Sequence, residues 1–315
     1  NRGSLLRKNA VFQSSNLKLF DQEIIELLKE VIKIMKPKTD QVISSIPVFS
    51  AFTTVLKLPE MPEDELKQAL LFQTKQYVPL PLEEIAFDWQ KVGEYEDEKG
   101  FKFQAIFLIA IPQDLIRKYQ RIFKEAGLSL LALEIEPVSL VRSVINNDTT
   151  PTIIVDIGSN ITSISLVEDA QLKFISQTDF AGASLTHTIA SALNINPLRA
   201  EEIKRERGIL GEGADYELLE LMIPVIGFII NEIKRAEFDY NINFGKSFNA
   251  ERIILSGGGA NLLGLDIYFQ KQFNKPTFKV EPLLQFEYNE NIEPLVKELN
   301  PLLAVSLGLV LRKFV

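Results

Sequence analysis

Two glycine turns, separated by about a hundred residues, are the segments of this sequence best suited to binding chemistry. The first turn, residues 156–160 (Asp-Ile-Gly-Ser-Asn), follows the apolar run Ile153-Ile154-Val155. The second turn, residues 257–261 (Gly-Gly-Gly-Ala-Asn), follows the run Ile253-Ile254-Leu255-Ser256. A phosphate or a nucleobase can approach the backbone closely at such a turn, because glycine has no Cβ. The pair of turns therefore points to a nucleotide as the class of ligand.

Asp156 is the carboxylate of the first turn and stands at the end of its strand. A carboxylate there can orient water on a phosphate-bound Mg²⁺, while the amides of Gly158, Ser159 and Asn160 face phosphate oxygens. In the alternative interpretation the segment is an ordinary turn between two strands, and Asp156 accepts local amide hydrogen bonds. Short matches of this kind often arise by chance, so the turn alone leaves both interpretations open.

Three consecutive glycines, Gly257, Gly258 and Gly259, separate the second strand from a helix that we expect to begin near Asn261. They let the backbone lie flat against a base or ribose and bring its amides towards phosphate. The alternative is a tight strand-to-helix connection without a ligand. Each glycine costs on the order of 0.5–1 kcal/mol on folding relative to alanine, which disfavours a purely structural role without excluding it.

Glu201 and Lys204 form a third candidate, because residues three apart on a helix share a face. Such a pair could grip a ribose and an adenine edge. The alternative is a solvated charge run over residues 201–207 (Glu-Glu-Ile-Lys-Arg-Glu-Arg), and the residues alone favour it. The single histidine, His187, has neither an adjacent nucleophile nor a metal partner, so we expect it on a helix surface.

The composition excludes several function classes. The net charge of −8 argues against a general nucleic-acid binder, which needs a basic footprint, and against direct adhesion to anionic lipid. The absence of cysteine excludes disulfides, thiolate metal sites and cysteine nucleophiles. The longest apolar runs, residues 221–230 and 302–311, fall short of the ~20 residues that span a bilayer. The start of the chain has no apolar run typical of a signal peptide.

The elements that must position these residues alternate between strands and helices in both halves of the chain. An amphipathic helix is predicted over residues 21–35, and strands follow at 41–48 and 51–58. A long helical pattern covers residues 216–244, with an interruption or kink expected at Pro224 and Gly227. The polar, proline-bearing stretch 146–151 is the predicted domain boundary. The pattern predicts an α/β fold.

Taken together, these residues resemble the type IV pilus assembly protein PilM family, which is related to the cell-division protein FtsA. The resemblance covers nearly the whole chain. Two features distinguish this family from actin, sugar kinases and DnaK-type chaperones. They are a proline corner, here residues 77–82 (Tyr-Val-Pro-Leu-Pro-Leu), and the placement of the small domain. The motifs that carry the resemblance are LPEMP (58–62), YVPLPLEE (77–84), EAGL (125–128), EIEP (134–137), VDIG (155–158), AEEIKR (200–205), LSGGGA (255–260) and LGLVLR (307–312).

The resemblance implies an actin-like, two-lobed α/β fold of the duplicated ribonuclease-H-like type, with ATP and Mg²⁺ in the cleft between the lobes. By position, residues 156–160 would be the second phosphate loop, with Asp156 as the catalytic carboxylate that holds Mg²⁺ through water. Residues 257–261 would be the adenosine loop. Glu201 and Lys204 match the helix that flanks the nucleoside in this superfamily.

The resemblance also divides the chain into four parts. Residues 1–45, 125–150 and 300–315 would form the core of the first lobe. Residues 46–124 would be the inserted small subdomain of the FtsA and PilM type. Residues 151–190 and 246–299 would form the core of the second lobe, and residues 191–245 its helical subdomain. The family opens with a strand and a Gly-x-Asp-x-Gly phosphate loop, and this sequence aligns from just after that loop, at Gly3-Ser4-Leu5.

The role implied by the resemblance is that of a cytoplasmic adaptor. Its partner would be the N-terminal cytoplasmic tail of PilN, an inner-membrane protein, docked in a groove of the first lobe near residues 59–81. Membrane attachment would then be only through the partner, and pilus motor and platform proteins would be further partners. We expect at most weak ATPase activity and no binding of nucleic acid.

Three alternatives stay open. The chain could be a filament-forming cytoskeletal ATPase like FtsA, which self-associates, or an adaptor of a related secretion or competence system. It could also be a kinase or a genuine ATPase of the same superfamily. A kinase should show a substrate-activating carboxylate and a sugar-binding loop, and the sequence offers no candidate for either.

Overall fold

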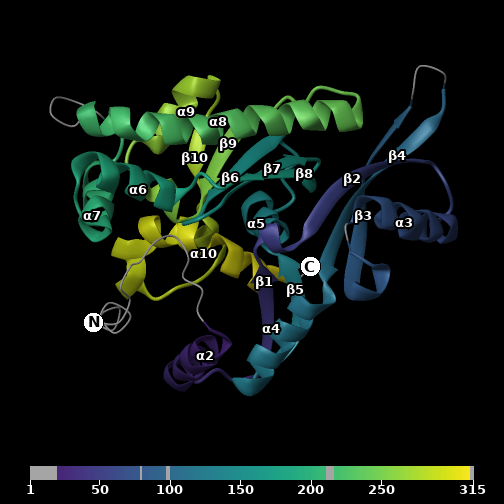
Figure 1. Ribbon diagram of the computed structural model, residues 1–315, viewed down its shortest axis with the longest axis horizontal. Helices are drawn as coiled ribbons and strands as arrows, with labels where there is room; N and C mark the ends of the chain where they lie inside the picture. Colours follow the sequence, from purple (N-terminus) through teal and green to yellow (C-terminus); the bar gives the residue numbers. More distant parts are fainter. Residues whose placement is uncertain (1–19, 79, 97–99, 211–215, 313–315) are drawn as a thin grey trace.

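The computed structural model describes residues 20–78, 80–96, 100–210 and 216–312 of the chain. Figure 1 shows that α8 and α2 lie on opposite sides of the molecule. The end segments 1–19 and 313–315, which the sequence assigned to the first lobe, lie outside the described residues. Pro79 of the proline corner lies outside them as well.

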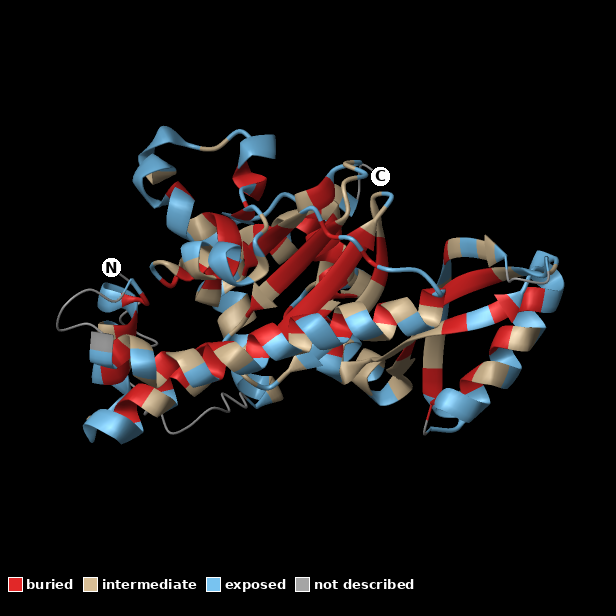
Figure 2. Cartoon of the chain, turned by 90° about the horizontal axis from the view of Figure 1, so that it is seen from above, coloured by how far each residue is buried: buried red, intermediate tan, exposed pale blue. Residues whose placement is uncertain are grey.

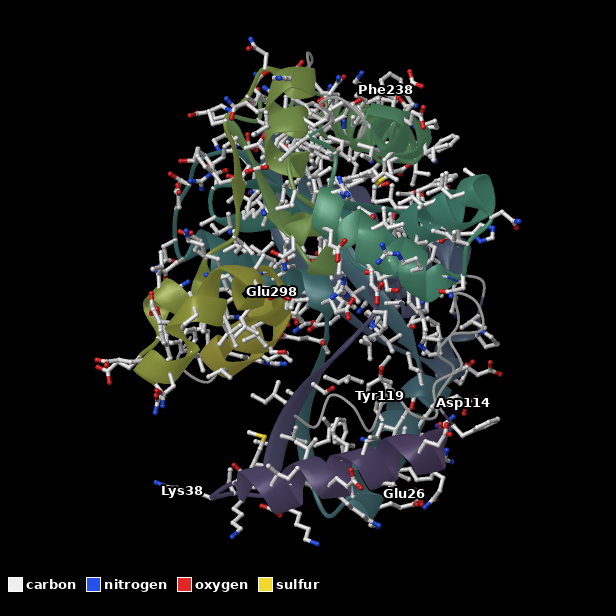
Figure 3. All side chains as sticks on the ribbon, turned by 90° about the vertical axis from the view of Figure 1, so that its left-hand side faces the viewer. Glu26, Lys38, Asp114, Tyr119, Phe238 and Glu298 are labelled. Atoms are coloured by element: carbon white, nitrogen blue, oxygen red, sulfur yellow. The ribbon has the colours of Figure 1, made fainter. Side chains whose placement is uncertain are left out.

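The first lobe is built around two parallel strands. Its elements are α2 (Asp21–Met35), β1 (Gln41–Ile46), α4 (Gln113–Glu125), β5 (Ser129–Ile135) and α5 (Glu136–Ile145). Strand β1 pairs with β5 from Gln41 opposite Ser129 to Ile46 opposite Ile135. Helices α2 and α4 pack through a cluster of Ile25, Ile122 and Ala126, and both lie at one end of the molecule (Figure 3). The predicted helix over residues 21–35 is confirmed.

A small antiparallel sheet is inserted between β1 and α4. It consists of β2 (Phe52–Pro59), β3 (Ile85–Glu96) and β4 (Lys102–Pro112) in the order β2-β4-β3. Helix α3 (Glu63–Tyr77) covers it, because Leu66 and Leu70 pack with Leu56, Ile106 and Leu108. Helix α4 falls in the predicted subdomain yet packs on α2 and β5, so the exact limits of the subdomain stay a prediction.

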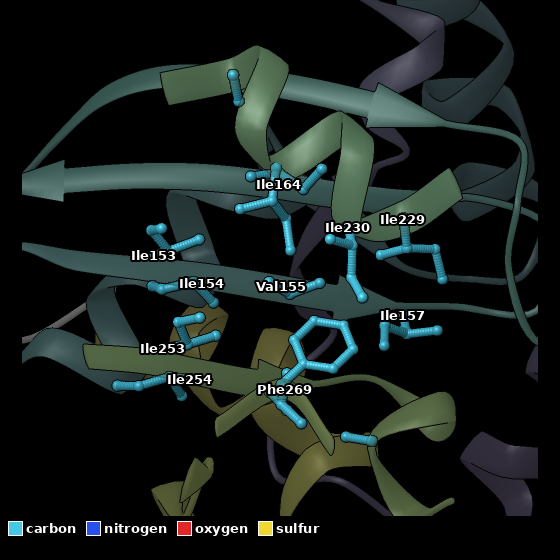
Figure 4. Close-up of a cluster of buried hydrophobic side chains, with 14 of the residues drawn as sticks. Ile153, Ile154, Val155, Ile157, Ile164, Ile229, Ile230, Ile253, Ile254 and Phe269 are labelled. Carbon is cyan, nitrogen blue, oxygen red and sulfur yellow. The ribbon is translucent and has the colours of Figure 1, made fainter. Parts of the chain in front are cut away.

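The second lobe contains a five-stranded sheet in the order β10-β9-β6-β7-β8. Its strands are β6 (Thr152–Ile157), β7 (Thr162–Glu168), β8 (Gln171–Thr178), β9 (Arg252–Ser256) and β10 (Thr277–Lys279). The central strand β6 runs parallel to β9 and antiparallel to β7. Ile153, Ile154 and Val155 are completely buried, because side chains pack on both faces of the sheet. Figure 4 shows these residues among their apolar neighbours.

The helices of the second half pack around this sheet. They are α6 (Gly182–Leu193), α7 (Pro197–Arg207), α8 (Tyr216–Phe244), α9 (Leu265–Phe273) and α10 (Val296–Leu311). Of the two outcomes expected at Pro224 and Gly227, an interruption does not occur, since α8 is one continuous helix that contains Pro224, and a kink stays a prediction. Buried residues such as Ile226 and Ile233 hold α8 on the core despite the proline. Figure 2 shows the resulting pattern, with buried residues along the sheet and mixed exposure along the helices. Short 3₁₀ helices occupy Val48–Ser50, Leu82–Glu84, Gly258–Asn261, Pro282–Gln285 and Glu290–Leu295.

Helix α10 returns to the first lobe and crosses α5 at very close range. A Cβ on Gly308 would lie 1.9 Å from the backbone oxygen of Ser139, so only glycine fits there. Arg142 of α5 donates to the backbone oxygen of Gly308 at 2.8 Å and pairs with Glu134 at 2.7 Å. These contacts join the end of the chain to the junction between the lobes.

One described stretch, Glu290–Leu311, is long and apolar enough to cross a membrane by length and composition. It is longer than the apolar run in the sequence, because a 3₁₀ helix leads directly into α10. The buried side chain of Asn300 accepts a hydrogen bond from the Leu283 amide at 2.9 Å. With the crossing at Gly308, this bond identifies α10 as a packed helix of the fold.

The inserted sheet also contacts the second lobe. Lys173 of β8 is buried, and its ammonium donates to the backbone oxygen of Val92 on β3 at 2.5 Å. Beside Val92, a Cβ on Gly93 would lie 3.5 Å from the ring of Phe244 at the end of α8. The inserted subdomain therefore packs against β8, the edge strand of the second-lobe sheet. In the sequence, however, it is inserted between elements of the first lobe.

Candidate functional site

Asp156 stands at the end of the central strand β6, next to the end of β9. In the sheet it lies opposite Ser256, the last residue of β9. Burial raises the pKa of the Asp156 carboxyl, and a hydrogen bond with Ser256 opposes this rise. The residue keeps part of its surface exposed. Asp156 is thus a crowded carboxylate at the point where β6 and β9 end side by side.

The first turn is a compact loop held by backbone hydrogen bonds. The Gly158 amide donates to the backbone oxygen of Ile161 at 3.0 Å, while Ser159 and Asn160 are exposed. Helix α6 begins behind the turn, where the amides of Gly182 and Ala183 donate to the backbone oxygens of Gly158 and Ser159 at 3.1 and 2.7 Å. The N-terminal end of α6 therefore supports the turn and directs its positive dipole towards it.

The second turn lies directly against the first. Gly257 has a positive φ of 78°, and a Cβ there would lie 2.5 Å from the backbone oxygen of Ile157 and 2.8 Å from Oδ1 of Asp156. A Cβ on Gly259 would lie 2.3 Å from Cγ2 of Ile157. The close packing of the two turns therefore explains why positions 257 and 259 are glycine. The same packing brings both turns to Asp156.

The other residues of the second turn face α10. A Cβ on Gly258 would lie 3.3 Å from the side chain of Leu302. The side-chain amide of Asn261 donates to the backbone oxygen of Glu298 at 2.9 Å, and Glu298 lies at the start of α10 (Figure 3). Asn261 therefore anchors the turn to α10 through one N–H of its side-chain amide.

Helix α7 closes another side of the site. Its end docks on the segment after the second turn, where the Ile209 amide donates to the backbone oxygen of Leu263 at 2.8 Å. Glu201 and Lys204, which the sequence placed on one face, form a salt bridge of 2.6 Å. Burial alone would raise the pKa of the Glu201 carboxyl, but hydrogen bonds with Lys204 and Thr186 hold it at about 2. Glu201 is a partly exposed carboxylate, whereas Lys204 is buried.

Glu136 is a site residue that the sequence interpretation missed. It is the first residue of α5, directly after β5, and it therefore approaches from the first lobe. Burial, and next the negative charge of Asp156, raise the pKa of its carboxyl to about 7. Its own charge contributes, after burial, to a raised pKa of Tyr119 on α4 (Figure 3). The signal in the sequence was a glutamate at the end of a strand, directly before Pro137.

The site thus combines two glycine turns, a helix N-terminus and two carboxylates whose charges interact. No group of three metal-ligating side chains occurs among the described residues. A divalent ion here would be held by Asp156, through water, together with oxygens of the ligand, which is the usual way that Mg²⁺ accompanies a phosphate. The turn amides and the dipole of α6 suit phosphate oxygens.

The fold and the position of these turns define an actin-like, two-lobed α/β protein with an inserted small subdomain, which confirms the predicted fold class. The solved structure of MreB5 of Spiroplasma citri bound to ADP is similar in fold. Its TM-score is 0.55 and its identity 15%, and the match covers 94% of this chain and 76% of that one.

The chain also matches the cell division protein FtsA of Enterococcus faecalis and of Enterococcus hirae, each 25% identical over 173 residues. The match covers 49% of this chain and 39% of each FtsA, so the chain spans well under half the length of these curated relatives. A solved PilM-PilN type IV pilus biogenesis complex matches with a TM-score of 0.78 and 20% identity, over 95% of this chain and 89% of that one. The family model for type IV pilus assembly protein PilM matches residues 4–314, and the chain belongs to this family, as its motifs predicted.

Proposed function

We propose that this protein is a cytoplasmic ATP-binding adaptor of the type IV pilus assembly platform. Membership of the PilM family supports the role in pilus assembly. The observation that carries nucleotide binding is the contact of both glycine turns with Asp156, because it gathers backbone amides, a helix N-terminus and a carboxylate at one point.

Each site residue has a role in this proposal. Asp156 orients water on Mg²⁺, and the amides of Ser159 and Asn160 face the phosphates. Gly158 forms the tight part of the turn, because its own amide donates to the backbone oxygen of Ile161. The backbone of Gly257, Gly258 and Gly259 lies under the nucleoside, with Asn261 at the edge. Glu201 accepts hydrogen bonds from ribose hydroxyls, because its ionised carboxylate remains partly exposed. When bound, Mg²⁺ would neutralise charge on the phosphates.

Glu136 is the group suited to receive a proton from an attacking water. Its pKa of about 7 lies near neutral pH, which is where a general base works best. It starts from the first lobe while Asp156 belongs to the second, so the distance between them depends on how the lobes close. Any hydrolysis would therefore depend on lobe closure, and weak turnover is the expected activity.

The proposed protein partner is the N-terminal cytoplasmic tail of a PilN-type membrane protein. The similarity to a PilM-PilN complex supports this partner. On the inserted subdomain, α3 exposes Leu71, Phe72 and Tyr77, which are 41%, 62% and 50% accessible. These apolar side chains lie in the segment 59–81 and suit an extended peptide that orders on binding. The protein would then reach the membrane, and motor or platform proteins, through that partner.

The experiment is a titration of a labelled PilN N-terminal peptide into the protein, with and without Mg-ATP. Saturable binding is the expected result, and a change of affinity with Mg-ATP would couple the cleft to the peptide site. Absence of binding to the folded protein under both conditions would overturn the adaptor role. Pelleting that requires ATP would instead favour a filament like FtsA. Steady ATP turnover well above background that is lost in Asp156→Ala would favour an enzyme.

A further inference from the structure

The ammonium of Lys204 is fully engaged inside the protein. It donates to the backbone oxygen of Gly182 at 3.0 Å, to Oγ1 of Thr186 at 2.8 Å and to Oε2 of Glu201 at 2.6 Å. A lysine ammonium has three protons, so these three bonds use all of its donors. The whole residue is only 9% exposed. Lys204 therefore has no donor left for a nucleotide.

Among the three acceptors of the Lys204 ammonium, the backbone oxygen of Gly182 is the one that connects Lys204 to the first turn. The amide of Gly182 donates to the backbone oxygen of Gly158 in the first turn, and the Ala183 amide donates to that of Ser159. The first turn therefore rests on the start of α6, and the start of α6 rests on Lys204. A Cβ on Gly182 would lie 3.1 Å from the Gly158 oxygen and 3.8 Å from the Lys204 ammonium, which shows how closely the three groups approach.

A buried charge needs compensation. Burial lowers the pKa of the Lys204 ammonium, and the hydrogen bond and charge of Glu201 oppose this effect. Buried ion pairs contribute little net stability compared with apolar packing, and in some proteins they are retained because they fix the groups around them in one arrangement. What Lys204 fixes is the peptide unit that holds the first turn.

We propose that Lys204 is a positioning residue, which holds the turn at residues 158–161 in its phosphate-binding conformation through Gly182. This inference rests on the proposed nucleotide function and assigns Lys204 to the phosphate end of the site. Thr186 belongs to the same support, because its hydroxyl contacts Lys204, Glu201 and Gly182. Glu201 alone then remains on α7 for the nucleoside.

The test compares the affinities of Lys204→Met for ATP and for adenosine with those of the unaltered protein. We expect at least a tenfold loss for ATP and less than a threefold loss for adenosine, so that the ratio of the two affinities changes. Lys173→Met is the matched control, because it also removes a buried ammonium but lies at the inserted subdomain. It should leave both affinities within threefold.

A second measurement needs no ligand. Amide hydrogen exchange in Lys204→Met should be faster by tenfold or more at residues 158–161 and 182–184, and unchanged at residues 257–261. Thr186→Val should give the same pattern with a smaller effect, because the bond between Lys204 and Gly182 remains. Equal losses for ATP and adenosine, or unchanged exchange at the turn in a folded variant, would overturn the proposal.

The two proposals can be separated. If the unaltered protein binds neither ATP nor adenosine, the nucleotide function fails, and with it any phosphate role of Lys204. If the unaltered protein binds ATP and Lys204→Met binds it equally well, only the positioning role fails.

Discussion

Glu136 at the start of α5 and Asp156 at the end of β6 interact through their charges across the junction of the two lobes. The negative charge of Asp156, added to burial, raises the pKa of Glu136 to about 7. Two carboxylates whose environments raise their pKa values are costly for folding, and such pairs are typical of functional sites. This relationship gives the first prediction.

Glu136→Gln should stabilise the protein at alkaline pH. Because the folded pKa of Glu136 lies above its ordinary value of 4.5, folding favours the protonated carboxyl. Its contribution to stability is full below about pH 4.5 and is lost as the pH rises through about 7. The free energy of unfolding of the variant should exceed that of the unaltered protein by up to about 3 kcal/mol at pH 8 and by about 1 kcal/mol at pH 5.

Urea unfolding at the two pH values measures this difference. The exposed Glu202→Gln serves as the control and should show no such dependence. A constant effect of Glu136→Gln across this range would contradict a raised pKa.

Asp156→Asn should remove the dependence of ATP binding on Mg²⁺. The amide keeps the size of the side chain and a hydrogen-bond partner for Ser256, but it loses the charge that orients water on the ion. We expect at least tenfold weaker binding with Mg²⁺, or about 1.4 kcal/mol, and little change in EDTA.

Calorimetric titration with and without Mg²⁺ gives the comparison. Asp114→Asn is the control, since Asp114 is an exposed aspartate on α4 in a surface ion pair. If both variants bind Mg-ATP as the unaltered protein does, Asp156 has no part in the site.

Gly308→Ala should destabilise the crossing of α10 and α5. Its Cβ would lie 1.9 Å from the Ser139 backbone oxygen, so the helices must separate and the bond from Arg142 to Gly308 must lengthen. Strain of this kind typically costs about 1–3 kcal/mol.

Gly227→Ala on α8 is the matched control for the crossing. Apart from the backbone of α8 itself, no described atom lies within 4 Å of a Cβ at that position, so alanine should stabilise the helix by about 0.5–1 kcal/mol. Thermal unfolding of the two variants should move the midpoint in opposite directions. If the unfolding midpoint falls in both variants, the destabilisation by Gly308→Ala is not specific to the crossing.

Lys173→Met should loosen the inserted subdomain from the second lobe. The bond to the Val92 backbone oxygen is lost, and the amides of β3 near Gly93 should exchange faster with solvent. Lys246→Met is the control, because Lys246 pairs with Glu168 from a half-exposed position. Unchanged exchange in β3 would show that apolar contacts alone hold the subdomain.

Apolar periodicity was enough to predict most elements of this protein. The helices over residues 21–35 and 216–244 follow from local apolar pattern, and the structure has them at these limits. The apolar run at residues 302–311 is shorter than α10, which begins at Val296 and continues through Pro301, because contacts with the rest of the fold hold the earlier part of the helix.

The sequence by itself determined the two glycine turns, the pair on α7 and the family, because these depend on residue types at fixed spacing. Tertiary structure decided which groups remain free to bind. It buried Lys204 behind the first turn and anchored Asn261 on α10. It also brought Glu136 to Asp156 from the other lobe. The spacing of residues along the chain does not predict these contacts, because they form only when separate strands and helices pack on one another.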